Sequence, residues 1–288
     1  MKVYLINDTS SCHAGSVKVM ENLRKYITDG GHKIIAEAKV SSSINKEHID
    51  NCDLVVVNGE GTLHHNARWA IKILDAMAYA QTKGKMVYLL NALYESMNDK
   101  FLEVIKRCDR ICAREIYSLY NLGDPINSNL DIHPDFCALN IKDAKPIGGI
   151  NGGIYKTQTH HAAIYKNCLT PLKYPNCSIG HKTSFDGYVE TYKKMDVVVT
   201  GQHHAVYAAF LADTPVVPTF GNSHKIESFL SWMKYPVMVC SDHNQVKEEI
   251  KKTQDGVYDE AWKESQKLFK YTVDKLDKYL KNIFSLNV

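Results

Sequence analysis

Short apolar runs alternate with longer helical patterns along the 288-residue chain, and this alternation constrains the fold more than any other feature. Each apolar run is long enough for one buried strand, and each helical pattern is long enough to return across a sheet. Repeated strand–helix–strand units build parallel sheets that carry helices on their faces. The sequence therefore predicts an α/β fold.

The alternation forms two sets, which predict two lobes. In the first set, strands are expected at residues 3–6, 33–36, 54–57, 86–90 and 110–113, and helices at 16–28, 69–82, 101–107 and 116–122. In the second set, strands are expected at 146–154, 197–200, 215–218 and 237–239, and helices at 205–212, 226–232 and from about 245 onward. Composition changes near residues 143–153, so we predict two Rossmann-like lobes with parallel sheets, residues 1–143 and 144–288. The terminal helices are expected to pack back across the lobes.

Composition and cysteine spacing indicate the cellular compartment of the protein. No apolar run approaches the roughly 20 residues that span a bilayer, and the first residues turn polar too early for a signal peptide. The eight cysteines form no CxxC pair, which favours reduced thiols and a cytoplasmic protein. The formal net charge of +3 does not by itself indicate a class of partner.

Polar residues are dense in the loop Asn7–Ser16, directly after the first predicted strand. Ligands of open α/β sheets bind at the carboxyl ends of the strands. Asp8 and His13 are candidate proton acceptors at this position. The alternative is an ordinary loop that ends in Ser16 as the N-cap of the following helix.

The stretch Asn58–Asn66 follows the strand at 54–57 and reads NGEGTLHHN. A glutamate at a buried strand end is costly unless it is paired or used, which makes Glu60 a candidate catalytic base. The glycines beside it allow a close backbone approach. His64 and His65 offer neutral bases or donors and are candidate contacts for an acceptor or an anion.

Two further strand-to-helix loops lie in the second lobe. They contribute the candidate donor-binding residues Gly201, Gln202, His203, His204, Asn222, Ser223, His224 and Lys225. The N–H groups at a helix N-terminus favour a bound anion, and Lys225 supplies a positive charge for a phosphate. The alternative is that Asn222 and Ser223 only cap the helix.

Three histidine pairs and one acid-free segment are further features of the sequence. His64–His65, His160–His161 and His203–His204 are adjacent residues without metal-ligand spacing, so no metal and no cofactor is predicted. Residues 144–185 contain no acidic residue, and lysines and tyrosines are interleaved there. This segment is a candidate track for a polyanion, carried by Lys156, Lys166, Lys173 and Lys182. The alternative is a basic lobe surface.

Taken together, these motifs resemble the polysaccharide pyruvyl transferase superfamily, whose members are similar to GT-B glycosyltransferases in fold. The resemblance rests on Asn7–Gly15, Asn58–His65, Arg114 with Glu115 and Ser118, Pro134–Asp135, Gly201–His204 and Asn222–Glu227. The stretches NGEGTLHH and NSHKIE resemble a small subgroup of that superfamily. The resemblance implies an enzyme of the transferase class acting on a capsular or lipopolysaccharide glycan, with Arg114 as a candidate anion contact.

One position departs from the family pattern. Members carry an arginine after the glycine of the second-lobe helix, and the resemblance implies that it holds phosphoenolpyruvate. Here Gln202 occupies that position, and glutamine lacks the charged fork that grips a carboxylate or a phosphate. The favoured hypothesis is therefore a glycosyltransferase with a nucleotide-sugar donor in the second lobe and the reaction between the lobes.

The acceptor and two alternatives stay open at this point. The acceptor hydroxyl is expected on a glycan or, given the lysine-bearing segment, on a hydroxymethylated base in phage DNA. The first alternative is a pyruvyl transferase that uses phosphoenolpyruvate. The second is a non-catalytic module that binds a glycan or a nucleic acid.

Overall fold

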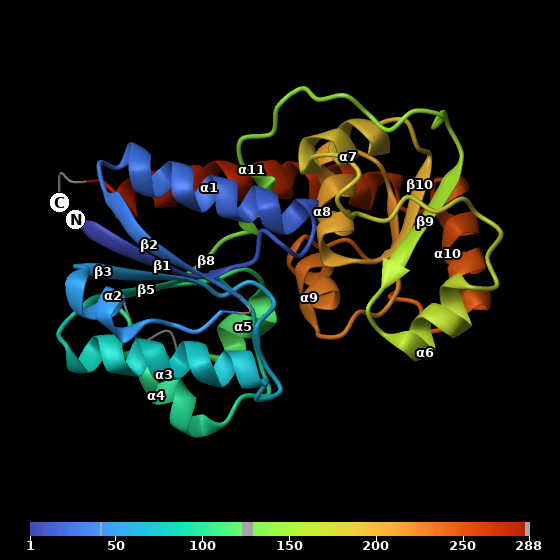
Figure 1. The fold of residues 1–288 in the computed structure, drawn as a ribbon. Coiled ribbons are helices and arrows are strands. Elements are labelled where there is room, and N and C mark those ends of the chain that lie inside the picture. Colours follow the sequence, from blue (N-terminus) through green and yellow to red (C-terminus); the bar gives the residue numbers. More distant parts are fainter. Residues whose placement is uncertain (41, 123–128, 286–288) are drawn as a thin grey trace. The chain divides into compact units, whose positions relative to one another are not determined.

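The computed structural model describes residues 1–40, 42–122 and 129–285, and it divides into two compact units (Figure 1). Unit 1 comprises Met1–Cys12, Val19–Phe136 and Asp274–Val288, and unit 2 comprises His13–Lys18 and Cys137–Val273. The main division lies at residues 136/137, a few residues before the predicted boundary at 143/144. The helices α1 (Ala14–Asp29) and α11 (Asp259–Ile283) each have residues in both units.

Unit 1 contains a six-stranded parallel sheet with the strand order β2-β1-β3-β5-β7-β8. The strands are β1 (Lys2–Asp8), β2 (Lys33–Lys39), β3 (Leu54–Asn58), β5 (Met86–Ala92), β7 (Arg110–Ala113) and β8 (Leu130–Ile132). The short strands β4 (Leu63–His64) and β6 (Tyr94–Glu95) pair separately. Every residue of β3 is buried, as expected for a central parallel strand with helices on both faces.

The helices of unit 1 cover both faces of this sheet. They are α2 (Lys46–Asn51), α3 (Arg68–Thr82), α4 (Asp99–Lys106) and α5 (Ile116–Asn121), together with most of α1 and the end of α11. The helix α1 lies on one face, and α2, α3 and α4 lie on the other (Figure 1). A buried core that includes Val55, Val87, Leu74 and Met77 fills the space between the strands and α3.

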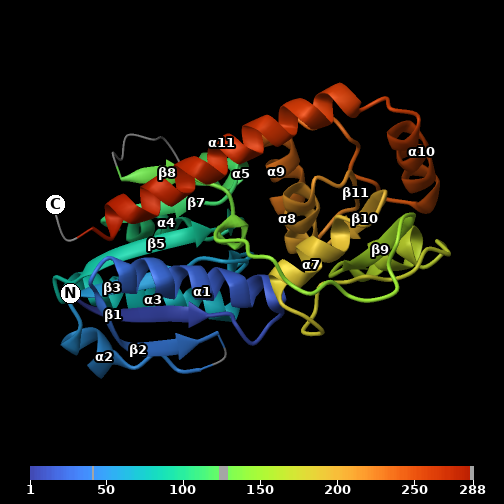
Figure 2. The same cartoon turned by 90° about the horizontal axis from the view of Figure 1, so that it is seen from above.

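Unit 2 is built around a three-stranded parallel sheet with the order β11-β10-β9. Its strands are β9 (Ile154–Thr159), β10 (Val197–Gly201) and β11 (Val216–Pro218). Its helices are α6 (Ala162–Ile164), the π-helical turn η2 (Tyr165–Leu169), α7 (Phe185–Tyr192), α8 (His203–Ala212), α9 (Lys225–Trp232), α10 (His243–Gln254) and most of α11, and the 3-10 turn η1 (Phe136–Ala138) lies at the division. The helices α8 and α10 lie on opposite faces of the sheet (Figure 2).

The α/β fold class and most predicted elements are confirmed, but three local predictions are wrong. No strand spans 146–154; the backbone there is irregular, with positive φ at Gly149, Gly152 and Gly153, and the strand begins only at Ile154. Residues 237–239 form no strand, and only an isolated bridge joins Thr219 to Cys240. Ser16 is not an N-cap, because α1 begins at Ala14.

Two further observations concern membrane-spanning helices and the cysteines. None of the helices within the described ranges has the length and apolar character needed to cross a membrane. All eight cysteines are unbridged, and every one except Cys12 is buried.

Candidate functional site

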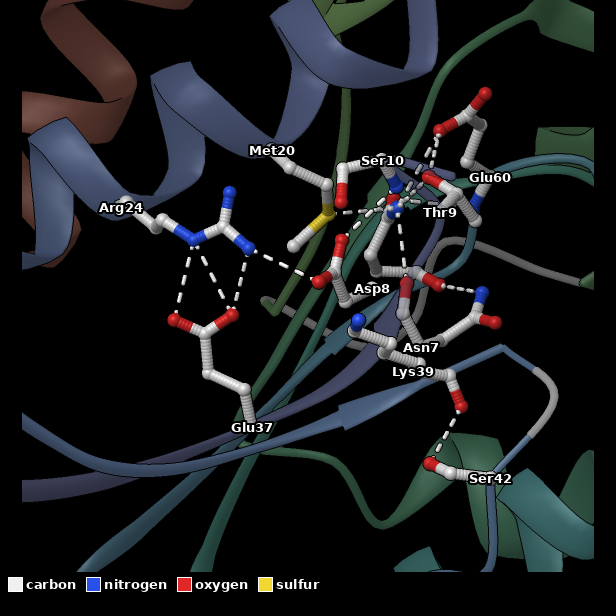
Figure 3. A network of polar contacts seen from close by, with 11 residues as sticks. Asn7, Asp8, Thr9, Ser10, Met20, Arg24, Glu37, Lys39, Ser42 and Glu60 are labelled. Carbon is white, nitrogen blue, oxygen red and sulfur yellow. Dashed lines mark hydrogen bonds and ion pairs between the residues drawn. The ribbon is translucent and has the colours of Figure 1, made fainter. Parts of the chain in front are cut away.

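In unit 1, a buried polar network occupies the carboxyl ends of β1 and β3 (Figure 3). These strands are neighbours, and Ile6 is in register with Val57, so Asn7 and Asn58 end the strands side by side. The Asn7 side-chain amide donates to the Asn58 carbonyl (2.6 Å) and to the Thr62 hydroxyl (3.0 Å). The Asn58 amide donates back to the Asn7 carbonyl (3.3 Å). The two loops are therefore locked together where the sheet ends.

Glu60 is the carboxylate that this network holds. Its Oε2 accepts a hydrogen bond from the Thr9 hydroxyl (2.6 Å) and a longer one from the Asn58 amide (3.4 Å), and its backbone N–H donates to Asn58 (3.2 Å). The residue is only 7% exposed. A carboxylate with fixed orientation in a largely dry setting is suited to accept a proton at a defined position.

The glycine before Glu60 serves the protein's own backbone. A Cβ on Gly59 would lie 2.6 Å from the Ala92 Cα, because the loop after β3 presses against the end of β5. The Gly59 N–H also donates to the Leu90 carbonyl (2.7 Å). The close approach expected at this glycine is thus an approach to a neighbouring strand.

The other first-lobe candidates have different surroundings. Asp8 is 4% exposed, accepts from the Ser10 N–H (2.9 Å), and pairs with Arg24 (3.0 Å), which also binds Glu37 (Figure 3). The Asp8 carboxylate is therefore held by partners within the protein. His64 and His65 turn their rings toward each other, with 3.0 Å between the two Nδ1 atoms.

Arg114 lies inside unit 1. It is 1% exposed, and its Nη1 donates to Asp135 Oδ2 at 2.9 Å, with the Asp135 side chain at 0% exposure. Its Nε finds no hydrogen-bond partner within the described parts of the chain. Glu115 and Ser118, next to it in the family motif, cap α5: the glutamate accepts from the Ser118 N–H (3.1 Å). This motif stabilises the local fold.

Asn91 is a member of the same sheet edge that the sequence analysis missed. It lies in β5 with a φ of 56°, is fully buried, and accepts from the Phe136 N–H (3.2 Å). Its Nδ2 atom has no partner among the residues described. The signal was present, since three of the strands predicted in the first lobe are followed by asparagine, in the stretches YLIN, VVVN and YLLN.

In unit 2, three strand ends converge across Gly201. The Thr159 hydroxyl at the end of β9 donates to the Phe220 carbonyl after β11 (2.7 Å), passing over the central strand. A Cβ on Gly201 would lie 2.4 Å from Thr159 Cβ and 2.7 Å from Thr219 Oγ1. The absence of a side chain at 201 is therefore what allows the two outer loops to meet.

Gly201→Ala is accordingly expected to destabilise unit 2 by about 1–3 kcal/mol, because overpacking forces the neighbouring loops apart. Chemical unfolding monitored by circular dichroism measures this loss. Gly148→Ala is the matched control, since a Cβ there meets no atom within 4 Å. Equal stabilities of the two variants would contradict the packing role of Gly201.

The loop before α9 carries the clearest features of an anion site. Ser223 is 8% exposed and Thr219 is fully buried, yet neither hydroxyl oxygen has a hydrogen-bond partner in the described structure. The Lys225 ammonium, at the first residue of α9, donates to Asn222 Oδ1 (2.5 Å). Partial burial and then the positive charge of Lys225 lower the pKa of His160.

The N-terminus of α8 is arranged differently. The Gln202 side chain accepts from the Ile179 N–H (3.0 Å) and donates to the Ile179 carbonyl (3.2 Å), so its amide is used within the protein. His203 and His204 are buried, with ring centroids 5.5 Å apart. The His204 ring lies edge-on to His13 (4.8 Å), whose Nδ1 accepts from Ser16 N–H at the start of α1.

The lysines of the acid-free segment differ in exposure and in their hydrogen-bond partners. Lys166, Lys173 and Lys182 are exposed. Lys156 instead donates to the carbonyls of Leu169 (2.8 Å) and Leu172 (2.5 Å), at the end of the π-helical turn η2. Its ammonium therefore satisfies backbone acceptors of its own unit.

Neither unit taken alone contains, among its described residues, three histidine, cysteine or carboxylate side chains grouped closely enough to hold a metal ion.

Comparisons with known proteins agree on the fold. No protein-family model matches the sequence, and comparison with curated protein sequences finds no match either. Several solved structures are similar. An S. aureus MnaA structure with UDP has a TM-score of 0.62 at 10% identity, covering 92% of this chain and 90% of that one. The Neisseria meningitidis UDP-GlcNAc 2-epimerase bound to UDP-GlcNAc has 0.55 at 12%, covering 96% and 100%. An uncharacterized Klebsiella pneumoniae protein has 0.56 at 14%, covering 83% and 92%.

These similarities define the class of fold. The chain has a GT-B-like α/β fold with parallel sheets and C-terminal helices, as the sequence analysis predicted. At identities this low the likeness concerns the fold, and the activity has to be argued from the residues of this chain.

Proposed function

We propose that the chain is a glycosyltransferase that binds a nucleotide-activated sugar through unit 2 and transfers the sugar to an acceptor hydroxyl. The observation that carries the proposal is the loop before α9. Two buried hydroxyls without partners, Ser223 and Thr219, accompany the Lys225 ammonium at a helix N-terminus. A diphosphate offers the acceptor oxygens and the negative charge that such a site favours. Solved structures of the same fold include proteins with bound UDP and UDP-GlcNAc.

In this proposal the acceptor oxygen attacks the anomeric carbon of the donor sugar. A new carbon–oxygen bond forms while the bond from that carbon to the diphosphate breaks, and the bonding pair leaves with the diphosphate. Lys225 and the N–H groups of α9 stabilise the departing negative charge. Glu60 takes the proton of the acceptor hydroxyl, and we rank it above Asp8, which is paired with Arg24, and above His13, which caps α1.

The acceptor is proposed to be a glycan in preference to a hydroxymethylated base in DNA. A nucleic-acid acceptor was suggested by the lysines of residues 144–185, but Lys156 is occupied by backbone carbonyls. The remaining exposed lysines of that set, Lys166, Lys173 and Lys182, make a smaller positive surface.

Two alternatives carry less support. A pyruvyl transferase, which the sequence motifs suggested, would need a group that grips phosphoenolpyruvate at position 202, and the Gln202 amide is bound to Ile179. A non-catalytic binding module would leave the buried orientation of Glu60 without a use.

Thermal unfolding of the full chain with UDP, UDP-GlcNAc or phosphoenolpyruvate tests the proposal. A ligand at about 100 times its dissociation constant stabilises the folded state by about 2.7 kcal/mol, which raises Tm by several degrees. We expect this rise with UDP or UDP-GlcNAc. Ser223→Ala is expected to weaken binding about tenfold and Lys225→Met about a hundredfold, through lost charged and neutral hydrogen bonds.

Ser231→Ala, an exposed position near the end of α9, is the matched control and should bind like the unaltered protein. A Tm that rises with phosphoenolpyruvate alone would replace the proposal with pyruvyl transfer. If both Ser223→Ala and Lys225→Met bound UDP and UDP-GlcNAc with unchanged affinity, the loop before α9 would be rejected as the donor site.

A further inference from the structure

A groove on unit 1 lies between α2 and α3, and its lining contains none of the candidate catalytic or donor-binding residues. Its volume is about 320 Å³, within the range of small-ligand sites. It is lined by Ser43, Ile44, Lys46, Ile49, Lys72, Asp75, Ala76 and Tyr79. Positions 72, 75, 76 and 79 form one face of α3, so the helix presents a continuous wall. We call these eight residues the α2–α3 groove.

The groove is continuous with the polar edge of the sheet. A second, small cavity shares Ile44 and Lys72 with it and is also lined by Asn7, Lys39 and Ser42. Figure 3 draws these three residues: Asn7 belongs to the network that holds Glu60, and the Lys39 carbonyl accepts from the Ser42 hydroxyl. A chain molecule that passes Asn7 at the end of β1 would therefore find its next binding surface in the α2–α3 groove.

The charge of the groove favours an anion. Lys46 and Lys72 line it, Lys39 lines the adjoining cavity, and Asp75 is the carboxylate of the lining. A second carboxylate, Asp50, accepts from the Tyr79 hydroxyl (2.9 Å) and pairs with Lys83 (3.9 Å). The floor is apolar, with Ile49 and Ala76 buried. Apolar ring faces and negative substituents would both be accommodated by such a surface.

The aromatic rings at the groove are covered by ammonium groups. Lys46 Nζ lies 4.8 Å and Lys83 Nζ 5.3 Å from the Tyr79 ring centroid, and Lys72 Nζ lies 4.2 Å from the centroid of Trp69. Single-stranded nucleic acids bind through bases stacked on open aromatic faces. Here the ammonium groups of Lys46 and Lys72 lie over the rings and leave the faces less open to a base. The same two ammonium groups are the cations that a carboxylate in the groove would meet.

We infer that the α2–α3 groove binds an anionic glycan, namely the sugar residues of the acceptor that lie beyond the reacting hydroxyl. That this glycan is the acceptor substrate rests on the proposed function. The binding of an anionic oligosaccharide by Lys46 and Lys72 rests on the groove alone. The site thus specifies the acceptor class as a glycan that carries carboxylate or other negative groups.

The test is binding of defined oligosaccharides to the full chain, measured by calorimetry at low and high salt. The probes are a hyaluronan hexasaccharide, a chondroitin sulfate hexasaccharide, neutral chitohexaose and an oligodeoxythymidine strand. We expect salt-sensitive binding of at least one anionic glycan and weaker binding of chitohexaose. The double variant Lys46→Gln/Lys72→Gln is expected to bind the anionic glycan about tenfold more weakly.

Two further variants separate groove binding from general charge. Lys100→Gln is the matched control, because Lys100 is also exposed and lies 4.8 Å from an aromatic centroid, that of Phe101, on another helix of the unit. It should bind like the unaltered protein. Ser43→Trp fills the groove from its exposed rim and should weaken binding without altering the core.

Three results would overturn the inference: no binding of either anionic glycan, unchanged affinity in the double lysine variant, or tighter binding of the oligodeoxythymidine strand through the same lysines. Tighter binding of the oligodeoxythymidine strand would instead favour a nucleic acid as the acceptor. The UDP-dependent rise in Tm tests the proposed function independently of glycan binding. If UDP binds and no anionic glycan binds, the groove is rejected as a glycan site and the proposed function stands. If an anionic glycan binds and UDP does not, only the proposed function is rejected.

Discussion

The Glu60→Gln variant is expected to lose about a thousandfold in sugar transfer, because a positioned general base contributes about 10²–10⁴ to a rate. Glutamine keeps the size of the side chain, and its amide oxygen still accepts from Thr9, so the network of Asn58 and Thr9 should persist. The variant should therefore fold and bind donor normally. The measurement is initial rate with the donor identified by thermal unfolding, together with the donor-dependent rise in Tm.

Glu103→Gln is the control for this experiment. Its carboxylate is 69% exposed on α4 and pairs only weakly with Lys106, so its loss should leave the rate unchanged. A Glu60→Gln enzyme with nearly full activity would show that another group takes the proton. Asp8→Asn and His13→Gln would then be the next variants to measure.

Breaking the Arg114–Asp135 pair is expected to cost about 3–5 kcal/mol of unfolding free energy, because either single replacement leaves a buried charge uncompensated. Both side chains are at most 1% exposed, so solvent cannot replace the lost partner. Arg114→Met and Asp135→Leu are the single variants. The double variant should be more stable than either, since an apolar pair of similar volume removes both charges together.

Denaturant unfolding of the three variants measures this coupling. The exposed pair Lys25–Asp29, with side chains 51% and 60% exposed, is the comparison, and Asp29→Asn should cost at most about 1 kcal/mol. If Arg114→Met lost no more than Asp29→Asn, the buried pair would have no special weight. A double variant less stable than both singles would contradict the explanation by uncompensated charge.

The sheet of unit 1 was predictable because its strands are marked by local composition. The runs at 54–57 and 86–90 are wholly apolar, and a strand buried on both faces requires this. The strand β9 escaped prediction because its sequence, IYKTQT, is mostly polar and it lies at the edge of its sheet. The neighbouring residues 146 and 147 are apolar and predict a strand, but the glycines after them break the backbone.

The candidate site was predictable only in part. Glu60, Ser223 and Lys225 were singled out because polar residues at strand ends are unusual. The roles of Arg114 and Gln202 were not foreseen, since each is decided by a distant partner: Asp135 for the first and the backbone of Ile179 for the second. Sequence patterns reveal that a polar side chain needs a partner, and they do not identify which one.

The sequence by itself determined the α/β class and most of the strands and helices in the two sets. Each depends on hydrophobic periodicity and on glycine or capping residues, which act over a few neighbouring positions. The tertiary structure alone decided which hydroxyls were left without partners, which cations faced the groove, and which charges were buried as pairs. These depend on the order in which strands become neighbours, and that order brings together residues far apart in the chain.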